Sequence, residues 1–108
     1  MNVEEFVKEF GYEAICMPTP ERTITGGYAG DLLSWVMGRL EADSAWITIM
    51  SNINIVAVAA LADPACIILA DGVLPDNGVI ERAMAQEVNI LRSAKTTFDI
   101  CADLRASL

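Results

Sequence analysis

No histidine occurs among the 108 residues of the chain. Without imidazole, the chain cannot build a Ser-His-Asp or Cys-His catalytic arrangement, and it lacks the commonest side-chain ligand of metal ions. Its most glycine-rich segment also lacks the lysine of the GxxxxGK[ST] phosphate loop and does not follow the GxGxxG pattern. The carboxylates show no spacing typical of a metal site. We therefore expect a protein without catalytic activity, without a metal and without a cofactor.

Basic residues are scarce: 7 Lys and Arg stand against 15 Asp and Glu, which gives a formal net charge of −8. Proteins that bind nucleic acid need clustered basic side chains to displace counterions from phosphates, and this chain has no basic cluster. The longest apolar run, residues 53–62, is far shorter than the roughly 18 residues that span a membrane. Residues 1–10 are acidic and amphipathic, unlike a signal peptide. We expect a cytoplasmic protein that binds neither nucleic acid nor a membrane.

Cysteine is also rare, with Cys16, Cys66 and Cys101 far apart and no CxxC pair. An odd number of cysteines in apolar runs predicts buried free thiols rather than a disulfide framework. Apolar residues, in contrast, make up 54% of the chain, which exceeds the usual share of about 45–50%. A single domain over residues 1–108 has a limited interior, so part of this apolar surface is expected to pack against a second copy. We therefore expect a homodimer.

Helical and extended patterns alternate along the chain. The predicted helices cover residues 2–10, 31–39, 53–61, 75–84 and 96–104, and the predicted strands cover 13–17, 22–25, 45–50, 66–70 and 88–91. Pro75 suits a first helical turn. The residues placed to cap helices are Asn2, Asp31, Asn52 and either Thr96 or Thr97. The side chains expected to face the core are Leu33, Val36, Met37 and Leu40, then Val79, Ile80, Ala83 and Met84, then Phe98, Cys101 and Leu104.

The alternation of strands and helices predicts an α/β fold, in which helices cover a mostly parallel sheet. Residues 47–50 and 66–69 are apolar at almost every position, as strands of a sheet covered on both faces must be. No linker, repeat or low-complexity tract divides the chain. We expect one three-layer α/β/α domain with a sheet of four or five short strands.

Residues 25–31, Thr-Gly-Gly-Tyr-Ala-Gly-Asp, form the one segment that points to a ligand. Glycines let backbone N–H groups approach a ligand closely, and a helix that follows such a loop can hold an anion. The same glycines also suit a tight turn with a close backbone contact, or a contact with a partner chain. The carboxylate of Asp31 disfavours a phosphate here. The segment therefore has three open interpretations: a turn, a ligand site or a subunit contact.

Polar residues after a predicted strand extend the candidate site. Ligands of parallel α/β sheets usually lie beyond the carboxyl ends of the strands, and Ser51 and Asn52 occupy such a place. Their side chains also suit helix capping and turn formation. The candidate ligand-binding residues are Arg22, Thr25, Gly26, Gly27, Tyr28, Gly30, Asp31, Ser51 and Asn52.

The predicted helix over residues 53–61 is apolar nearly all round. Helices of this kind are buried on more than one side. The second side is either the interior of the domain or a partner subunit, and the sequence favours neither.

Residues 22–34, Arg-Thr-Ile-Thr-Gly-Gly-Tyr-Ala-Gly-Asp-Leu-Leu-Ser, together with residues 45–49 and 52–59, resemble the DRTGG domain family. The resemblance runs from about Cys16 to Leu104. The full Asp-Arg-Thr-Gly-Gly motif that names the family does not occur here, and Thr25-Gly26-Gly27 is a partial match.

The resemblance implies a three-layer α/β/α fold similar to the N-terminal domain of HPr kinase/phosphorylase and to the regulatory DRTGG domain of CBS-domain pyrophosphatases. Such domains act as regulatory or dimer-forming modules with no established catalytic activity. We therefore expect a non-catalytic regulatory or interaction module that forms a homodimer in signalling or metabolic regulation, with another regulatory or metabolic protein as a further partner. The alternative is a sensor of a small ligand, a nucleotide or phosphate, that binds at residues 26–31.

Overall fold

A five-stranded sheet runs through the middle of the computed structural model, which describes residues 1–108. The strands are β1 (Glu13–Cys16), β2 (Gly26–Ala29), β3 (Ser44–Thr48), β4 (Cys66–Leu69) and β5 (Ile90–Arg92). They lie in the order β1-β5-β4-β3-β2. Strands β2 to β5 are parallel to one another, and β1 pairs antiparallel with β5. The predicted mostly parallel sheet is confirmed.

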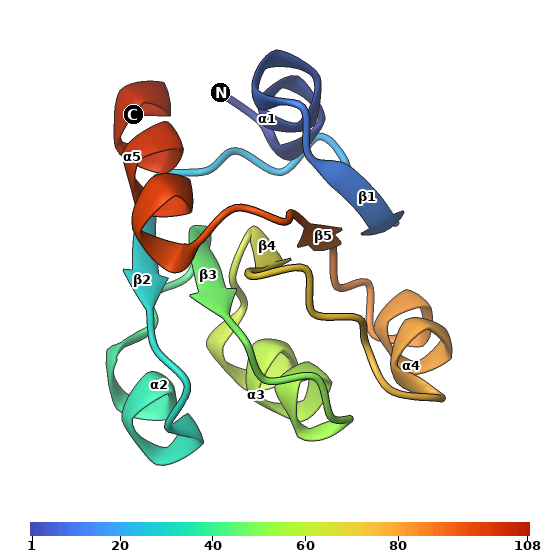
Figure 1. The fold of residues 1–108 in the computed structure, drawn as a ribbon. Helices are drawn as coiled ribbons and strands as arrows, with labels where there is room; N and C mark the ends of the chain where they lie inside the picture. The colour runs from blue at the N-terminus through green and yellow to red at the C-terminus, as the bar shows by residue number, and fades with distance from the viewer.

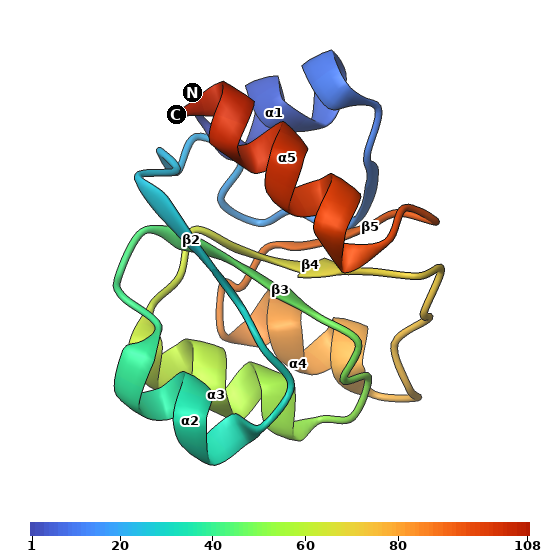
Figure 2. The same cartoon turned by 60° about the vertical axis from the view of Figure 1, so that its left-hand side comes forward.

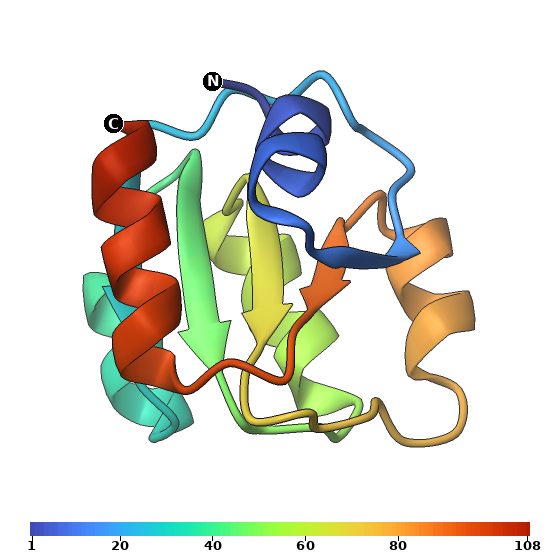
Figure 3. The same cartoon turned by 45° about the horizontal axis from the view of Figure 1, so that its top comes forward.

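Helices cover both faces of this sheet (Figures 1 and 2). The helices are α1 (Val3–Phe10), α2 (Leu33–Arg39), α3 (Asn54–Ala62), α4 (Val79–Ala85) and α5 (Thr97–Ser107). Helices α1 and α5 lie on one face, and α2, α3 and α4 lie on the other. Figure 3 looks past α1 and α5 onto β3 and β4, with α3 behind the sheet. The buried apolar side chains accordingly form two clusters, one on each face, so the predicted three-layer α/β/α architecture is confirmed.

The two central strands are buried along their whole length. Every residue of β3 and β4 is buried, because each strand has a neighbour on both sides and helices on both faces. The fully buried indole of Trp46 satisfies its N–H by donating to the carbonyl of Gly30 at 2.9 Å. The apolar patterns of residues 45–50 and 66–70 thus predicted both strands, with an error of one or two residues at their ends.

Caps define both terminal helices as the sequence predicts. The Asn2 side chain accepts from the backbone N–H of Glu5, whose carboxylate accepts from the backbone N–H of Asn2. Gly11 ends α1 in the left-handed region at φ 75°, where a residue without Cβ is favoured. Thr96 caps α5 by accepting from the N–H of Asp99.

The glycine segment is a strand, which corrects the predicted loop. Gly26 to Ala29 form β2, paired parallel with β3 from Ser44 to Ile47. The strand predicted over residues 22–25 is wrong, since its only bridge joins Thr23 to Asn2. The glycines of residues 26–30 have no positive φ. They therefore do not form a left-handed turn, and a different constraint must account for them.

That constraint is the close approach of α5 to the sheet. A Cβ atom on Gly27 would lie 2.2 Å from Cδ2 of Leu104, whose side chain is buried. Carbon atoms cannot approach so closely without displacement. Gly27 therefore lets α5 pack directly on the backbone of β2, which agrees with the close-contact interpretation of the glycines.

Three helix starts differ from the prediction. Asp31 does not cap α2, because its carboxylate accepts from the Thr48 hydroxyl and the Ile49 N–H, at 2.8 and 2.9 Å. Pro75 lies in a loop, since α4 begins at Val79, after Gly78 with φ 87°. At α3 the N-cap position is Ile53, without a side-chain cap, and the Asn52 side chain instead accepts from the N–H of Asn54 at 2.9 Å in the preceding turn.

Several side chains predicted to face the core are exposed instead. Helices α2 and α4 have seven residues each, so each buries only the side chains that point directly at the sheet. Val36 on α2 does so, as does Leu40 directly after it, and Val79 and Ala83 do so on α4. The exposed exceptions are Met37, Ile80, Met84 and Phe98, the last with 82% of its surface accessible.

The three cysteines are free thiols, as predicted. Cys16 and Cys66 are buried, and Cys101 is half-buried. Burial raises the pKa of Cys66 to about 12. A thiol with so high a pKa stays protonated and unreactive, so Cys66 serves as a small apolar residue of the core.

A polar contact ties α5 to the segment between α1 and β1. The Asp103 carboxylate accepts from the Tyr12 hydroxyl at 2.9 Å and from the Lys95 ammonium at 2.5 Å. Desolvation opposes ionisation of Asp103, but the hydrogen bonds from Lys95 and Tyr12 hold the pKa of this carboxyl below its ordinary value. The ionised carboxylate therefore stabilises the folded state.

This contact predicts a pH dependence of stability. A carboxyl whose pKa is lower in the folded state stabilises fully above its unfolded pKa, and the gain disappears as pH falls through the folded pKa. We expect the free energy of unfolding of the wild type to decrease more steeply below about pH 5 than that of Asp103→Asn. Urea denaturation at a series of pH values measures both, and equal slopes would contradict the prediction.

The contact between Gly27 and Leu104 predicts a specific coupling. Gly27→Ala should lower the free energy of unfolding by roughly 1–3 kcal/mol through overpacking, and Leu104→Ala by roughly 2–5 kcal/mol through lost burial. In the double variant, the shortened side chain leaves room for the new methyl group. We expect its stability to be close to that of Leu104→Ala alone, and strictly additive losses in urea denaturation would refute the steric explanation.

Candidate functional site

The candidate ligand-binding residues of the sequence do not meet at one place. Arg22 and Thr25 lie where the parallel strands begin, because both contact Asp43, which directly precedes β3. Asp31, Ser51 and Asn52 lie at the other end of the sheet, where β2 and β3 stop. The glycines of β2 connect the two ends. A ligand of ordinary size could therefore contact only part of the predicted set.

Arg22 is held by two turns at the amino end of the sheet. Its guanidinium donates to the carboxylates of Asp43 and Asp63, at 2.6 and 2.8 Å, and to the Asp63 carbonyl at 3.0 Å. Both aspartates have positive φ, 64° and 59°, a conformation that Asp tolerates in turns. Burial by itself would lower the pKa of Arg22, but the two carboxylates raise it. The charge of Arg22 is thus balanced within the chain.

The polar candidates at the carboxyl end also have partners within the chain. Asp31 accepts from Thr48 and Ile49, as described above. The Ser51 hydroxyl donates to the carboxylate of Asp76 at 2.9 Å. These bonds fix the connections that follow β3 and β4, which agrees with the turn-forming role considered for Ser51 and Asn52.

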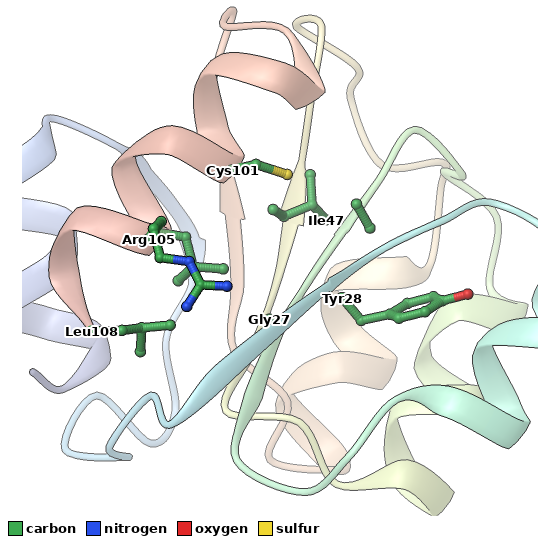
Figure 4. A pocket seen from close by; sticks show the side chains of 8 residues that line it. Gly27, Tyr28, Ile47, Cys101, Arg105 and Leu108 are labelled. Atoms are coloured by element: carbon green, nitrogen blue, oxygen red, sulfur yellow. The ribbon is translucent and has the colours of Figure 1, made fainter.

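A small pocket lies between β2 and α5, and it borders the glycine segment (Figure 4). Its volume is about 180 Å³, and its lining residues are Gly27, Tyr28, Ala29, Ile47, Cys101, Leu104, Arg105 and Leu108. Figure 4 shows the Tyr28 side chain pointing away from α5 and its Arg105. The pocket is smaller than the roughly 300–1,000 Å³ of typical small-molecule sites, so it has room for little more than one side chain.

A larger groove lies on the opposite face, between α3 and α4. Its volume is about 300 Å³, and its lining residues are Ile53, Asn54, Val56, Ala57, Ala60, Arg82 and Gln86. The floor is apolar, and the small side chains of Ala57 and Ala60 leave the space open. We name this cavity the α3–α4 groove.

The polar side chains of the α3–α4 groove are Asn54, Arg82 and Gln86. Unlike Arg22, Arg82 forms no salt bridge and donates no side-chain hydrogen bond within the chain. Gln86, the C-cap residue of α4, follows Arg82 by four residues, so the two side chains lie on the same side of the helix end. Polar groups over an apolar floor are the usual composition of a ligand site.

No motif in the sequence marks the α3–α4 groove. Arg82 is not among the predicted ligand-binding residues, and residues 53–61 are predicted only as an apolar helix that faces the interior or a partner subunit. The available signal was the combination of Ala57 and Ala60 on one helix with Arg82 on another and Gln86 at the end of that second helix. That signal becomes specific only when α3 and α4 are known to be neighbours.

No group of three or more Cys, Asp or Glu side chains is arranged to hold a metal ion. None of the helices has the length and apolar character that crossing a membrane requires.

A solved structure supports the fold. The chain is similar to the CBS and DRTGG domains of the regulatory region of Clostridium perfringens pyrophosphatase, solved in complex with its activator diadenosine tetraphosphate, with a TM-score of 0.73 and 13% sequence identity. The similarity covers 99% of this chain and 47% of the pyrophosphatase chain, so this chain spans about half of that structure. At this identity the likeness shows a shared fold. No curated protein matches the chain.

The family comparison is more direct. The family model described as DRTGG domain matches residues 29–107, which include three of the parallel strands and the helices from α2 to α5. The match begins after the Gly26-Gly27 pair, so the glycines of β2 are not what carries it. The resemblance inferred from the sequence is confirmed, and the chain belongs to the DRTGG domain family.

Proposed function

We propose that this chain is a non-catalytic regulatory module that forms a homodimer through the outer face of α2 and α3. Its family and fold support a regulatory role, since the structurally similar domain lies in the regulatory region of a pyrophosphatase. The lack of histidine supports the absence of catalysis, and the free cysteines suit the reducing cytoplasm. The partner we propose first is a second copy of the chain.

The distribution of acidic residues carries this proposal. The chain has 15 acidic residues, yet α2 and α3 contain none. Two copies with a net charge of −8 repel each other, and they approach most easily where acidic side chains are missing. The only charged residue of the two helices is Arg39, which does not add to the negative charge.

The same two helices expose large apolar side chains. Trp35 is 55% exposed and Leu61 is 75% exposed. The Arg39 guanidinium lies 3.8 Å from the centre of the Trp35 ring, so a cation–π contact holds the indole in place on the surface. Rigid aromatic groups are favoured anchors of protein interfaces because little side-chain entropy is lost when they bind. An apolar, acid-free face suits a symmetric contact, in which the same surface is used by both copies.

The structure also accounts for the apolar character of α3. Ile55, Val56, Val58 and Ala59 are buried against the sheet and neighbouring helices, whereas Leu61 and the small residues of the outer face are exposed. One side of the helix therefore belongs to the core of the domain. We propose that Leu61, on the exposed side, belongs to the subunit contact.

A single exposed residue tests the dimer. Burial of a leucine side chain contributes roughly 1.5–3 kcal/mol, and a two-fold interface contains the residue twice. We expect Leu61→Glu to weaken dimerisation at least about 100-fold, measured by sedimentation equilibrium. The matched control is Phe98→Glu, because Phe98 is a large apolar residue of even greater exposure that lies on α5, and we expect it to leave the dimer intact.

Thermal unfolding followed by circular dichroism establishes that both variants are folded. A wild-type protein that remains monomeric at high micromolar concentration would overturn the proposal. Equal weakening by the two variants would place the contact elsewhere.

A further inference from the structure

We propose that the α3–α4 groove binds a purine nucleoside monophosphate, with the base on the apolar floor and the phosphate on Arg82. This site does not include the glycine segment, and its lining does not include Trp35 or Leu61, the two exposed apolar residues on which the dimer proposal rests. It rests on the size, lining and charge of the groove.

The size of the groove selects the class of ligand. Small-molecule sites usually have volumes of roughly 300–1,000 Å³, and the groove, at about 300 Å³, lies at the lower limit. It thus has room for one base with its sugar phosphate rather than for a dinucleotide. The pocket between β2 and α5, at about 180 Å³, is too small for the same ligand.

The floor of the groove suits the flat face of a base. Val56 is fully buried beneath it, and the methyl groups of Ala57 and Ala60 form a shallow apolar surface without branches. A larger side chain at either alanine would occupy the space. An aromatic ring system buries apolar area on such a floor without losing a hydrogen bond.

The two amide side chains suit the edge of the base. Asn54 and Gln86 each carry a donor and an acceptor, and neither side chain is used in a hydrogen bond within the chain. Paired amide donors and acceptors recognise adenine in many proteins that bind nucleic acid. Side chains from two different helices can therefore hold the ring within the groove.

Arg82 supplies the charge for the phosphate. It is exposed, has no carboxylate partner and is the only charged residue of the groove. In this acidic chain, four of the seven basic residues form salt bridges, so an arginine left free at a cavity is available to an anion. Guanidinium groups bind phosphate through two parallel hydrogen bonds.

Titration of the ¹⁵N-labelled protein with AMP tests the proposal. We expect saturable shifts of the backbone resonances of Asn54, Ala57, Ala60, Arg82 and Gln86. Adenosine and inorganic phosphate should each bind at least about 10-fold more weakly than AMP, because each makes only part of the contacts. The absence of shifts at these residues at millimolar AMP would overturn the proposal. Shifts confined to the pocket between β2 and α5 would overturn it as well.

Two pairs of variants assign the roles. Arg82→Gln should weaken AMP binding about 10- to 100-fold, whereas Arg105→Gln, which removes another exposed arginine without a carboxylate partner, should not. Ala60→Leu should abolish binding by filling the groove, whereas Ala102→Leu, at an exposed alanine of α5, should not. Undiminished binding to Arg82→Gln or Ala60→Leu would refute the site.

The ligand site and the dimer can fail independently. We expect Leu61→Glu to become monomeric and still bind AMP, because Leu61 does not line the groove. Loss of AMP binding by this folded monomer would contradict a site contained within one subunit. Dimerisation itself is measured without nucleotide, so its outcome leaves the binding result unaffected.

Discussion

The burial of β3 and β4 on both faces is the constraint on which the rest of the structure depends. Every residue of the two strands is buried, so a helical layer is needed on each side of the sheet. A chain of 108 residues must divide its helices between two layers. The helices are consequently short, and α2 and α4 each bury little more than the side chains that point straight at the sheet. The apolar residues left over lie at the surface, where they are available to a partner.

Because of the same constraint, the interior of the domain has no space for a ligand site. The two core clusters are occupied by packed apolar side chains, and the polar residues at the strand ends are bonded into turns. Arg22 joins the turns that precede β3 and β4, and Asp31 joins the connections that follow β2 and β3. Free polar groups remain on the outer helices. Both cavities, the α3–α4 groove with Arg82 and the smaller pocket with Arg105, are therefore lined by residues of the outer helices, and only the groove reaches the volume of a small-molecule site.

The elements that the sequence predicts well are those whose signal is local. Residues of β3 and β4 are apolar without alternation, and α1 has both a cap and a terminal glycine, so short windows suffice to identify them. Local patterns do not predict the strand β2, because Gly-Gly-Tyr-Ala has little intrinsic preference for a strand. It is extended because β3 lies beside it and offers hydrogen bonds. The helix predicted to begin at Pro75 is wrong for a similar reason, since a proline suits both a loop and a first helical turn.

The same difference between local signals and signals that depend on neighbouring elements decides which functional residues can be predicted. A glycine that binds a ligand and a glycine that admits a neighbouring helix look identical in a sequence, and only the position of Leu104 decides in favour of the second for Gly27. Conversely, Arg82 attracts no attention in the sequence, because an arginine on a short amphipathic helix usually faces solvent. It becomes a candidate when the fold sets it beside the small side chains of α3. In a domain this small, a binding site depends less on a motif than on which helices the sheet makes neighbours.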